Sequence, residues 1–490
     1  MKQILFAASV ALVLLYPCAA AASAVWITNV TLVSPEKLDQ VAPGSVLVRD
    51  GRIVSVSRGG RQVRPAGATI VDGKGYFLSP GLIDSHVHLH GVPGMTPEMS
   101  KEKKDMADAY FRQLPRSFLY YGYTTVIDLA LADRAVIAQF NAAPLHPDVI
   151  HCSEPLVLAN GYPMSYFKPG ERFDKFPNFI YDPAQAATIP SRYRPKDYSV
   201  EAGVARVKAG GGVCVKTHYE LGFGKENKLP VMSSAMFADV RNAASAQALV
   251  LVTHANTFEA QQFAVAGKAD VIAHGLWKWG QFDKRTELPV EIAAMLDKIV
   301  EQGTGFQPTM QVLYGLRAYF DADYLANPAV RKVVPASMAA WFNTPEGKWF
   351  KADLAEEEAD SDVLKGFEQP LRRARLVLAY LAAKDANVLL ATDTPSGPTY
   401  GNLPGLNGYL EMQRMHEAGL SLAQVFKAAT INNARTFKLD KQVGTIEAGK
   451  VANLVLMKKS PLLDITAYDS IETVWVRGKM VARETMAAPN

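Results

Sequence analysis

Pro80-Gly81-Leu82-Ile83-Asp84-Ser85-His86-Val87-His88 is the stretch that decides the fold. It predicts a short apolar strand that ends on two histidines spaced i, i+2. Because alternate side chains of a strand point to the same face, both imidazoles can hold one metal ion. An H-x-H pair also occurs as a satisfied pair in a core, so the rest of the chain has to decide between the two.

Further side chains with metal-binding capacity recur at the ends of later apolar runs. Lys216 follows Gly-Val-Cys-Val, His254 follows Leu-Val-Leu-Val-Thr, His274 follows Asp-Val-Ile-Ala, and Asp393 follows Val-Leu-Leu-Ala-Thr. Core packing does not explain this repeated placement. The pattern therefore favours a site assembled from several strand ends.

The region 79–438 alternates apolar runs with helical patterns, which is typical of an α/β (β/α)8 TIM-type barrel. The candidate ligands follow strands one, four, five, six and eight, at the carboxyl ends where the chemistry of such barrels lies. The predicted strands are 77–88, 124–129, 148–152, 212–218, 248–254, 270–274, 304–310 and 387–393.

Short strand-like runs separated by Gly, Pro and Asp turns occupy both ends of the chain. The first group lies in 25–78 and the second in 439–490. Neither group makes a complete sheet alone. We therefore predict one small discontinuous β-sandwich domain formed by both termini.

The length, composition and charge of the chain argue for a large folded core and against nucleic-acid binding. The chain has 490 residues, 49% of them hydrophobic, and 52 Lys and Arg against 48 Asp and Glu give a formal net charge of +4. This length can bury a large core, and no basic run suggests nucleic acid as a partner. The expected partner is a small-molecule substrate, and a homo-oligomer stays open.

The amino terminus predicts a secretory signal peptide over 1–24. A basic start, an apolar stretch and a small-residue site at Ala22-Ser23-Ala24 follow one another. The alternatives are a membrane anchor, for which the apolar run is short, and a lipoprotein at Cys18, against which Pro17 argues. We expect a periplasmic or secreted protein without stable membrane insertion after cleavage.

Cys152 and Cys214 are the cysteines that remain after the signal segment. Two are too few for a disulfide framework, and both lie in apolar runs. We therefore expect buried thiols.

Two connections, 156–200 and 311–369, are much longer than a barrel requires. Long loops on the active face of a barrel cap the site or select substrates. Packing of their many aromatic side chains onto the barrel is an equally good interpretation.

These residues together resemble the amidohydrolase superfamily, and within it the imidazolonepropionase-like and prolidase-like binuclear metal hydrolases. The resemblance covers almost the whole chain after the signal segment. It rests on 79–88, Val215-Lys216, Thr253-His254-Ala255, Ala273-His274-Gly275, Ala391-Thr392-Asp393-Thr394, and the tail segments 429–435 and 443–450. The loop at 159–163 and the segment 404–409 depart from the family pattern, which puts a relative's substrate in doubt.

The resemblance implies that His86, His88 and Asp393 hold one metal ion and that His254 and His274 hold a second. Lys216 would bridge the two ions, which requires a carbamate formed from carbon dioxide because an ammonium group cannot bind a cation. A lysine paired with an acid is the alternative. Nitrogen and oxygen ligands suit two Zn²⁺ ions, although manganese, cobalt or iron also fit.

The implied reaction is the cleavage of an amide bond by a metal-bridging hydroxide, with Asp393 as catalytic proton shuttle. The substrate would be a dipeptide, an N-acyl amino acid or a cyclic amide. His218 and Tyr219, just beyond Lys216, are the candidates for substrate binding, with structural roles as alternatives. The competing functions are a mononuclear deaminase of the same superfamily and a non-catalytic binding protein on this scaffold.

Overall fold

The computed structural model describes residues 24–38, 40–59, 64–131, 134–223, 228–321 and 323–489. The signal peptide predicted over 1–24 thus lies, except for Ala24, outside the described residues. Among the helices that are described, none combines the length and the apolar character needed to cross a membrane.

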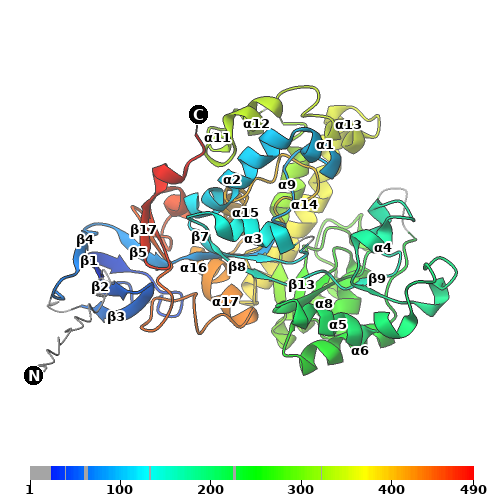
Figure 1. The fold of residues 1–490 in the computed structure, drawn as a ribbon, viewed down its shortest axis with the longest axis horizontal. Helices are drawn as coiled ribbons and strands as arrows, with labels where there is room; N and C mark the ends of the chain where they lie inside the picture. The colour runs from blue at the N-terminus through cyan, green and yellow to red at the C-terminus, as the bar shows by residue number, and fades with distance from the viewer. Residues whose placement is uncertain are drawn as a thin grey trace, which may run out of the picture.

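Strands from both ends of the chain form one eight-stranded sheet, at the left of Figure 1. Its order is β17-β16-β15-β5-β1-β2-β3, and β4 pairs with β1. Antiparallel pairing of β15 with β5, from Leu454 opposite Pro80 to Met457 opposite Phe77, joins the two ends. The two-layer sandwich and the domain boundaries stay predictions. The strands are β1 Val25–Leu32, β2 Ala42–Arg49, β3 Arg52–Arg58, β4 Thr69–Asp72, β5 Phe77–Pro80, β15 Leu454–Met457, β16 Ile471–Val476 and β17 Lys479–Ala482.

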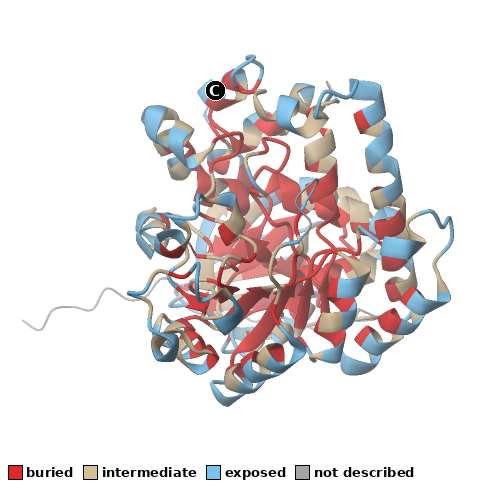
Figure 2. Cartoon of the chain, turned by 90° about the vertical axis from the view of Figure 1, so that its right-hand side faces the viewer, coloured by how far each residue is buried: buried red, intermediate tan, exposed pale blue. Residues whose placement is uncertain are grey.

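Two parallel sheets lie in the centre of the molecule, where buried residues concentrate (Figure 2). One has the order β6-β7-β8 and the other β11-β12-β13-β14. They are β6 Leu82–Val87, β7 Tyr123–Asp128, β8 Asp148–His151, β11 Cys214–His218, β12 Val250–His254, β13 Val271–Ala273 and β14 Gly305–Gln307. Each coincides with a strand predicted from the sequence to within a few residues, although 77–88 is divided between β5 and β6.

Backbone contacts link the two parallel sheets at both of their edges. The N–H of Val213 donates to the carbonyl of His151 at 3.0 Å, which joins β11 to β8. On the other side, parallel bridges pair Phe306 with Val388 and Val87 with Thr394, so the segment 387–394 lies between β14 and β6. This mixed α/β arrangement is consistent with a TIM-type barrel.

Helices follow most of these strands and cover them from outside (Figure 1). Hydroxyl side chains accept the first free N–H groups of several helices, as Ser233 does for α6 and Thr257 for α7. The helices around the central sheets are α1 Pro97–Glu102, α2 Lys104–Tyr120, α3 Arg134–Ala142, α5 Val200–Ala209, α6 Ser234–Ala246, α7 Phe258–Ala266, α8 Val290–Gln302, α14 Asp360–Ala383, α15 Leu406–Glu417, α16 Leu422–Lys427 and α17 Asn433–Thr436.

The two long connections contain structure of their own. The first holds the small parallel pair β9 Val157–Leu158 and β10 Phe179–Ile180, the helix α4 Arg172–Lys175, and a separate apolar cluster around Phe173 and Phe179. The second packs onto the central body, where the Trp349 indole N–H donates to the carbonyl of Gly94 at 2.9 Å. Its helices are α9 Met310–Arg317, α10 Asp323–Ala326, α11 Val330–Val333, α12 Ala336–Trp341 and α13 Phe350–Ala355.

Cys152 and Cys214 form a disulfide, so the prediction of free buried thiols is wrong. The two residues are 62 positions apart in sequence, but Cys152 directly follows β8 and Cys214 begins β11, and their Cα atoms lie 4.4 Å apart. The long insertion 156–200 separates them along the chain, and the adjacency of β8 and β11 brings them together. A count of cysteines cannot reveal this adjacency.

Candidate metal site

Three predicted ligands converge where β6 ends. Asp393 Oδ1 lies 2.9 Å from the Nε2 atom of His86 and 2.9 Å from that of His88. The Asp393 N–H donates to the carbonyl of His86 at 2.7 Å, which fixes the segment 387–394 against β6. Asp393 has a φ of 57°, in the left-handed region that non-glycine residues seldom adopt. The backbone therefore aims this carboxylate at the two histidines.

His274 and His254 complete one side of the site. The Nδ1 atom of His274 lies 3.9 Å from Asp393 Oδ2, and its ring centroid is 5.0 Å from that of His86. The His254 ring lies 4.7 Å from the His274 ring. His86, His274 and Asp393 each offer a ligand atom within 4.8 Å of the others, a spacing that one metal ion could bridge.

Lys216 is 2% exposed and lies on β11, with no hydrogen-bond partner for its Nζ within the described residues. The parallel register pairs Lys216 with Val252 and His218 with His254 on β12. Burial lowers the pKa of Lys216 to about 8, and the attraction of Asp393 only partly opposes this. A buried amine without a partner costs free energy.

Burial keeps His86, His254 and His274 neutral, the form that binds metals. It lowers the pKa of His86 to about 3 and moves those of His254 and His274 below the ordinary value. For Asp393, burial alone would raise the pKa, but attraction to His86 and His274 and hydrogen bonds from both strand-end histidines hold it well below its usual range. The site thus combines neutral imidazoles with an ionised carboxylate.

The residues present fit a metal site by the chemistry of their donors and by what the protein leaves unpaired. Within the described chain, the buried Nδ1 atoms of His86 and His88 and the Nζ of Lys216 have no hydrogen-bond partner. Imidazole nitrogens and carboxylate oxygens are the donors that zinc takes in enzymes. The six predicted ligands belong to one cluster, since Lys216 interacts electrostatically with His86, His254 and Asp393.

The two residues predicted to bind substrate lie on opposite sides of β11. The His218 ring is beside the site, 5.6 Å from that of His254. Tyr219 points outward, because its hydroxyl donates to Glu259 on α7 at 2.8 Å and its ring packs 4.5 Å from Phe263. This placement argues against a substrate contact for Tyr219.

Two residues beside the site had no predicted role. Glu220 is 3% exposed, and its Oε2 lies 3.3 Å from His254 Nε2. The half-buried Tyr162 places its ring 4.8 Å from that of His254. Glu220 could have been found by extending the alternation Lys216, His218 one step further, whereas Tyr162 comes from the long insertion and has no signal in the pattern.

Asp84 forms hydrogen bonds that link the two segments carrying the predicted ligands. Its Oδ2 accepts from the Thr392 hydroxyl at 2.7 Å and its Oδ1 from the N–H of His86 at 3.2 Å. The Asn433 amide donates to the carbonyls of Ile83 at 2.8 Å and Leu390 at 2.9 Å. These bonds tie β6 to the segment 387–394 and explain why Asn433 belongs to the motif at 429–435.

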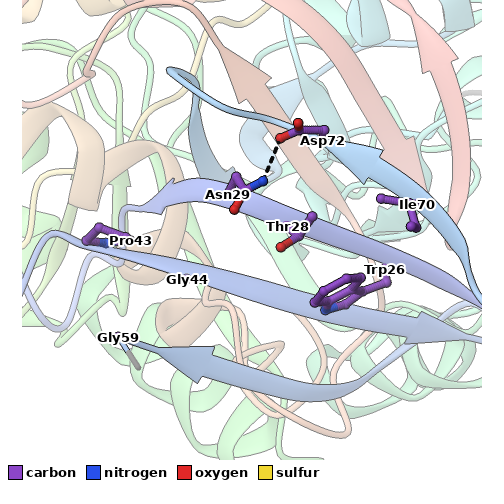
Figure 3. Close-up of a pocket in the computed structure, with 8 residues that line it drawn as sticks. All are labelled: Trp26, Thr28, Asn29, Pro43, Gly44, Gly59, Ile70 and Asp72. Atoms are coloured by element: carbon purple, nitrogen blue, oxygen red, sulfur yellow. Dashed lines mark hydrogen bonds between the residues drawn. The ribbon is translucent and has the colours of Figure 1, made fainter. Parts of the chain in front are cut away.

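A cavity of about 550 Å³ lies away from these residues, on the terminal sheet (Figure 3). Two of its lining residues are joined by a hydrogen bond, in which the Asn29 amide donates to Asp72 at 2.9 Å. No predicted metal ligand lines this cavity, so it is not part of the candidate site. The lining residues are Trp26, Thr28, Asn29, Pro43, Gly44, Gly59, Ile70 and Asp72.

Parts of the chain are similar in sequence to known proteins. The model of the amidohydrolase family matches residues 361–481. The chain is 34% identical over 102 residues to an imidazolonepropionase of Treponema denticola, covering 20% of this chain and 24% of that protein. It is 36% identical over 93 residues to a dihydroorotase of Methanothermobacter thermautotrophicus, covering 19% and 18%. The chain thus matches about a quarter or less of the length of these curated relatives.

Solved structures with the same fold include a Xaa-Pro dipeptidase with bound methionine, at 18% identity and a TM-score of 0.63 over 94% of this chain and 100% of that one. Molinate hydrolase matches at 17% identity and a TM-score of 0.65, over 94% of this chain and 95% of that one. Ochratoxinase of A. niger matches at 16% identity and a TM-score of 0.64, over 94% and 96%.

The fold and the cluster define an α/β protein with a histidine- and carboxylate-lined site at its strand ends. In sequence, residues 361–481 are similar to the amidohydrolase family, and the solved structures that share this fold include an amidohydrolase and a prolidase.

Proposed function

We propose that this protein is a secreted, binuclear metal-dependent hydrolase that cleaves an amide bond in a dipeptide, an N-acyl amino acid or a cyclic amide. The observation that carries the proposal is the convergence of four histidines, Lys216 and Asp393 in one buried cluster. We further infer that β6, β7, β8, β11 to β14 and the segment 387–394 form the eight strands of a (β/α)8 barrel around it.

In this proposal, His86, His88 and Asp393 hold one divalent ion, and His254 and His274 hold the other. Zinc is the preferred metal because its ligands are nitrogen and oxygen atoms. When bound, such ions acidify a water molecule and polarise the substrate carbonyl. Asp393, with its ionised carboxylate, accepts the proton of the attacking water and delivers it to the leaving amine.

Lys216 becomes a ligand only after carboxylation. Its neutral amine forms an N–C bond to carbon dioxide and releases a proton, which leaves a carbamate with two oxygen donors. The burial of Lys216 and the absence of a partner for its Nζ within the described residues support this step. If Lys216 were instead an ordinary lysine in a salt bridge, an acidic side chain would lie next to its Nζ.

The secreted location is supported by the disulfide between Cys152 and Cys214, since disulfides persist in oxidising compartments. The test is the amino-terminal sequence of the protein recovered from the periplasm or the medium of an expressing bacterium. Cleavage after Ala24 supports the proposal, and an intact amino terminus found only inside the cell contradicts it.

The metal centre is tested by elemental analysis of protein purified with zinc and bicarbonate, for the wild type and for Lys216→Ala. About two ions per chain, falling to one or none in the variant, support the bridged centre. One ion in both proteins would favour the mononuclear deaminase, as the compact group of His86, His274 and Asp393 alone could hold it. A panel of dipeptides, N-acyl amino acids and cyclic amides then identifies the substrate, with Asp393→Asn as the inactive control.

A further inference from the structure

Glu220 is a buried carboxylate beside the proposed metal centre. It lies two residues beyond His218, where β11 ends, and is 3% exposed. Its Oε1 accepts the N–H of Gly222 at 2.8 Å, and its Oε2 lies 3.3 Å from His254 Nε2. No lysine or arginine of the described chain forms an ion pair with it. An ionised group without a cation partner is costly to bury unless it has another task.

The contact with His254 determines which ring nitrogen carries the proton. A carboxylate only accepts hydrogen bonds, so the contact with Glu220 requires a proton on His254 Nε2. The Asn256 amide nitrogen lies 3.4 Å from the same atom and would need an unprotonated Nε2. The shorter contact with the charged group prevails. The free lone pair of His254 is therefore on Nδ1.

In His274 the nitrogen that contacts the protein is Nδ1, whereas in His254 it is Nε2. Its Nδ1 lies 3.0 Å from the Thr309 hydroxyl, so its Nε2 remains for another ligand. Its ring centroid lies 4.7 Å from that of His254, with the two planes at 74°. Neighbouring protein groups thus occupy one nitrogen of each ring and leave the other nitrogen available.

We propose that Glu220 is a positioning residue of the metal centre. It holds the proton on His254 Nε2 and so presents His254 Nδ1 to the ion, while the Gly222 N–H holds the carboxylate in place. This inference rests on the proposed function, because it needs an ion at His254. Carboxylates that bind the free nitrogen of a metal-ligating histidine orient the ring and raise its basicity, and their loss lowers metal affinity 10- to 100-fold.

The test measures zinc affinity by competition with a chelator and the visible absorption spectrum of the Co²⁺-loaded protein. The variants are Glu220→Ala, Glu220→Gln and Glu259→Gln. Glu259 is the matched control, because it accepts a hydrogen bond from the neighbouring Tyr219 on the outer side of β11. The melting temperature of each metal-free protein separates a loss of affinity from a loss of folding.

We expect Glu220→Ala to lower the affinity for one of the two zinc ions by roughly 10- to 100-fold and to change the absorption spectrum of the Co²⁺-loaded protein. Glu220→Gln should lie between this variant and the wild type, because its amide oxygen still accepts from Nε2–H without the charge. Glu259→Gln should match the wild type. Equal zinc affinities for the wild type and both Glu220 variants would overturn the inference alone. A wild type that binds fewer than two ions would overturn the proposed function and this inference with it.

Discussion

Tyr219, the residue that follows β11, has surroundings different from those of its two neighbours in sequence. Its hydroxyl donates to Glu259 and its ring packs on Phe263, both on α7 outside the strands. His218 and Glu220, one residue to either side, both contact His254. Successive side chains of a strand point to opposite faces, so these three residues cannot share one role.

We predict that Tyr219→Phe leaves KM unchanged and lowers the free energy of unfolding by about 1 kcal/mol, the typical net value of one hydrogen bond. His218→Ala should instead raise KM, because the His218 ring lies beside the site. Steady-state kinetics on the identified substrate and urea unfolding check both variants. A large rise of KM in Tyr219→Phe would show that the tyrosine reaches the substrate after all.

Glu411 gives a prediction on pH. This buried carboxyl accepts the N–H groups of Met310 at 3.0 Å and Gln311 at 2.6 Å, yet burial raises its pKa to about 7 from 4.5. The folded state therefore binds the proton more tightly than the unfolded chain, so this residue lowers stability as the pH rises from about 4.5 to about 7.

We expect this effect to reach about 3 kcal/mol in the wild type and to be absent in Glu411→Gln, which cannot ionise. Urea unfolding of both proteins at several pH values between 4.5 and 8 measures the difference. Asp84, whose pKa burial also raises to about 7, is present in both proteins, and its charge contributes to the raised pKa of Glu411, so the difference between the curves includes this repulsion. Parallel curves for the two proteins would contradict the prediction.

The sequence indicated which side chains come together because strand ends and alternation are local properties; that they bind metal stays a prediction. All six predicted ligands follow apolar runs, and the structure brings them together. They are His86, His88, Lys216, His254, His274 and Asp393. The same rule, applied to Tyr219, would have excluded it and selected Glu220. Tyr162 could not be predicted, because its contact with His254 depends on how the insertion 156–200 folds back.

At the scale of elements, the disulfide joins two strands that an insertion separates. Cys152 directly follows β8, and Cys214 is the first residue of β11, two residues before Lys216. Between them the chain forms β9, β10 and α4 around a separate apolar cluster. The covalent bond therefore keeps the first half of the central strands beside the second half across this insertion.

We predict that the double variant Cys152→Ala/Cys214→Ala lowers the free energy of unfolding by about 2–4 kcal/mol, the typical value for one disulfide. Urea unfolding with and without a reductant that acts on the unfolded chain measures it. The reductant should lower the free energy of unfolding of the wild type and leave that of the variant unchanged. An equal response of the two proteins would mean that the disulfide does not form.

At the scale of the whole molecule, the terminal sheet is connected directly to the strand that carries His86. Between β5 and β6, the N–H of Gly81 donates to the carbonyl of Asn453 at 2.8 Å, and that of Leu82 donates to Gly122 at 2.9 Å. Trp475, with no exposed surface, packs in the apolar cluster of this sheet. Loss of the sheet should therefore disturb the proposed metal centre.

We predict that Trp475→Ala lowers stability by about 3–5 kcal/mol and that metal release and unfolding occur at the same temperature. Differential scanning calorimetry and a zinc-sensitive dye record the two events. Leu463→Ala is the matched control, because Leu463 is 81% exposed and its loss should change neither. Unfolding of the sheet well before metal release would show that the two parts are independent.

The pairing of β5 with β15 also has a consequence for biosynthesis. A ribosome makes β5 at Phe77–Pro80 early, but the strand that pairs with it on one side is not made until Leu454–Met457. During most of translation β5 lacks its partner β15, so the terminal sheet cannot be completed. Final folding is therefore a late step that follows synthesis of the last strands, and a chain interrupted before Leu454 should be a substrate for proteases.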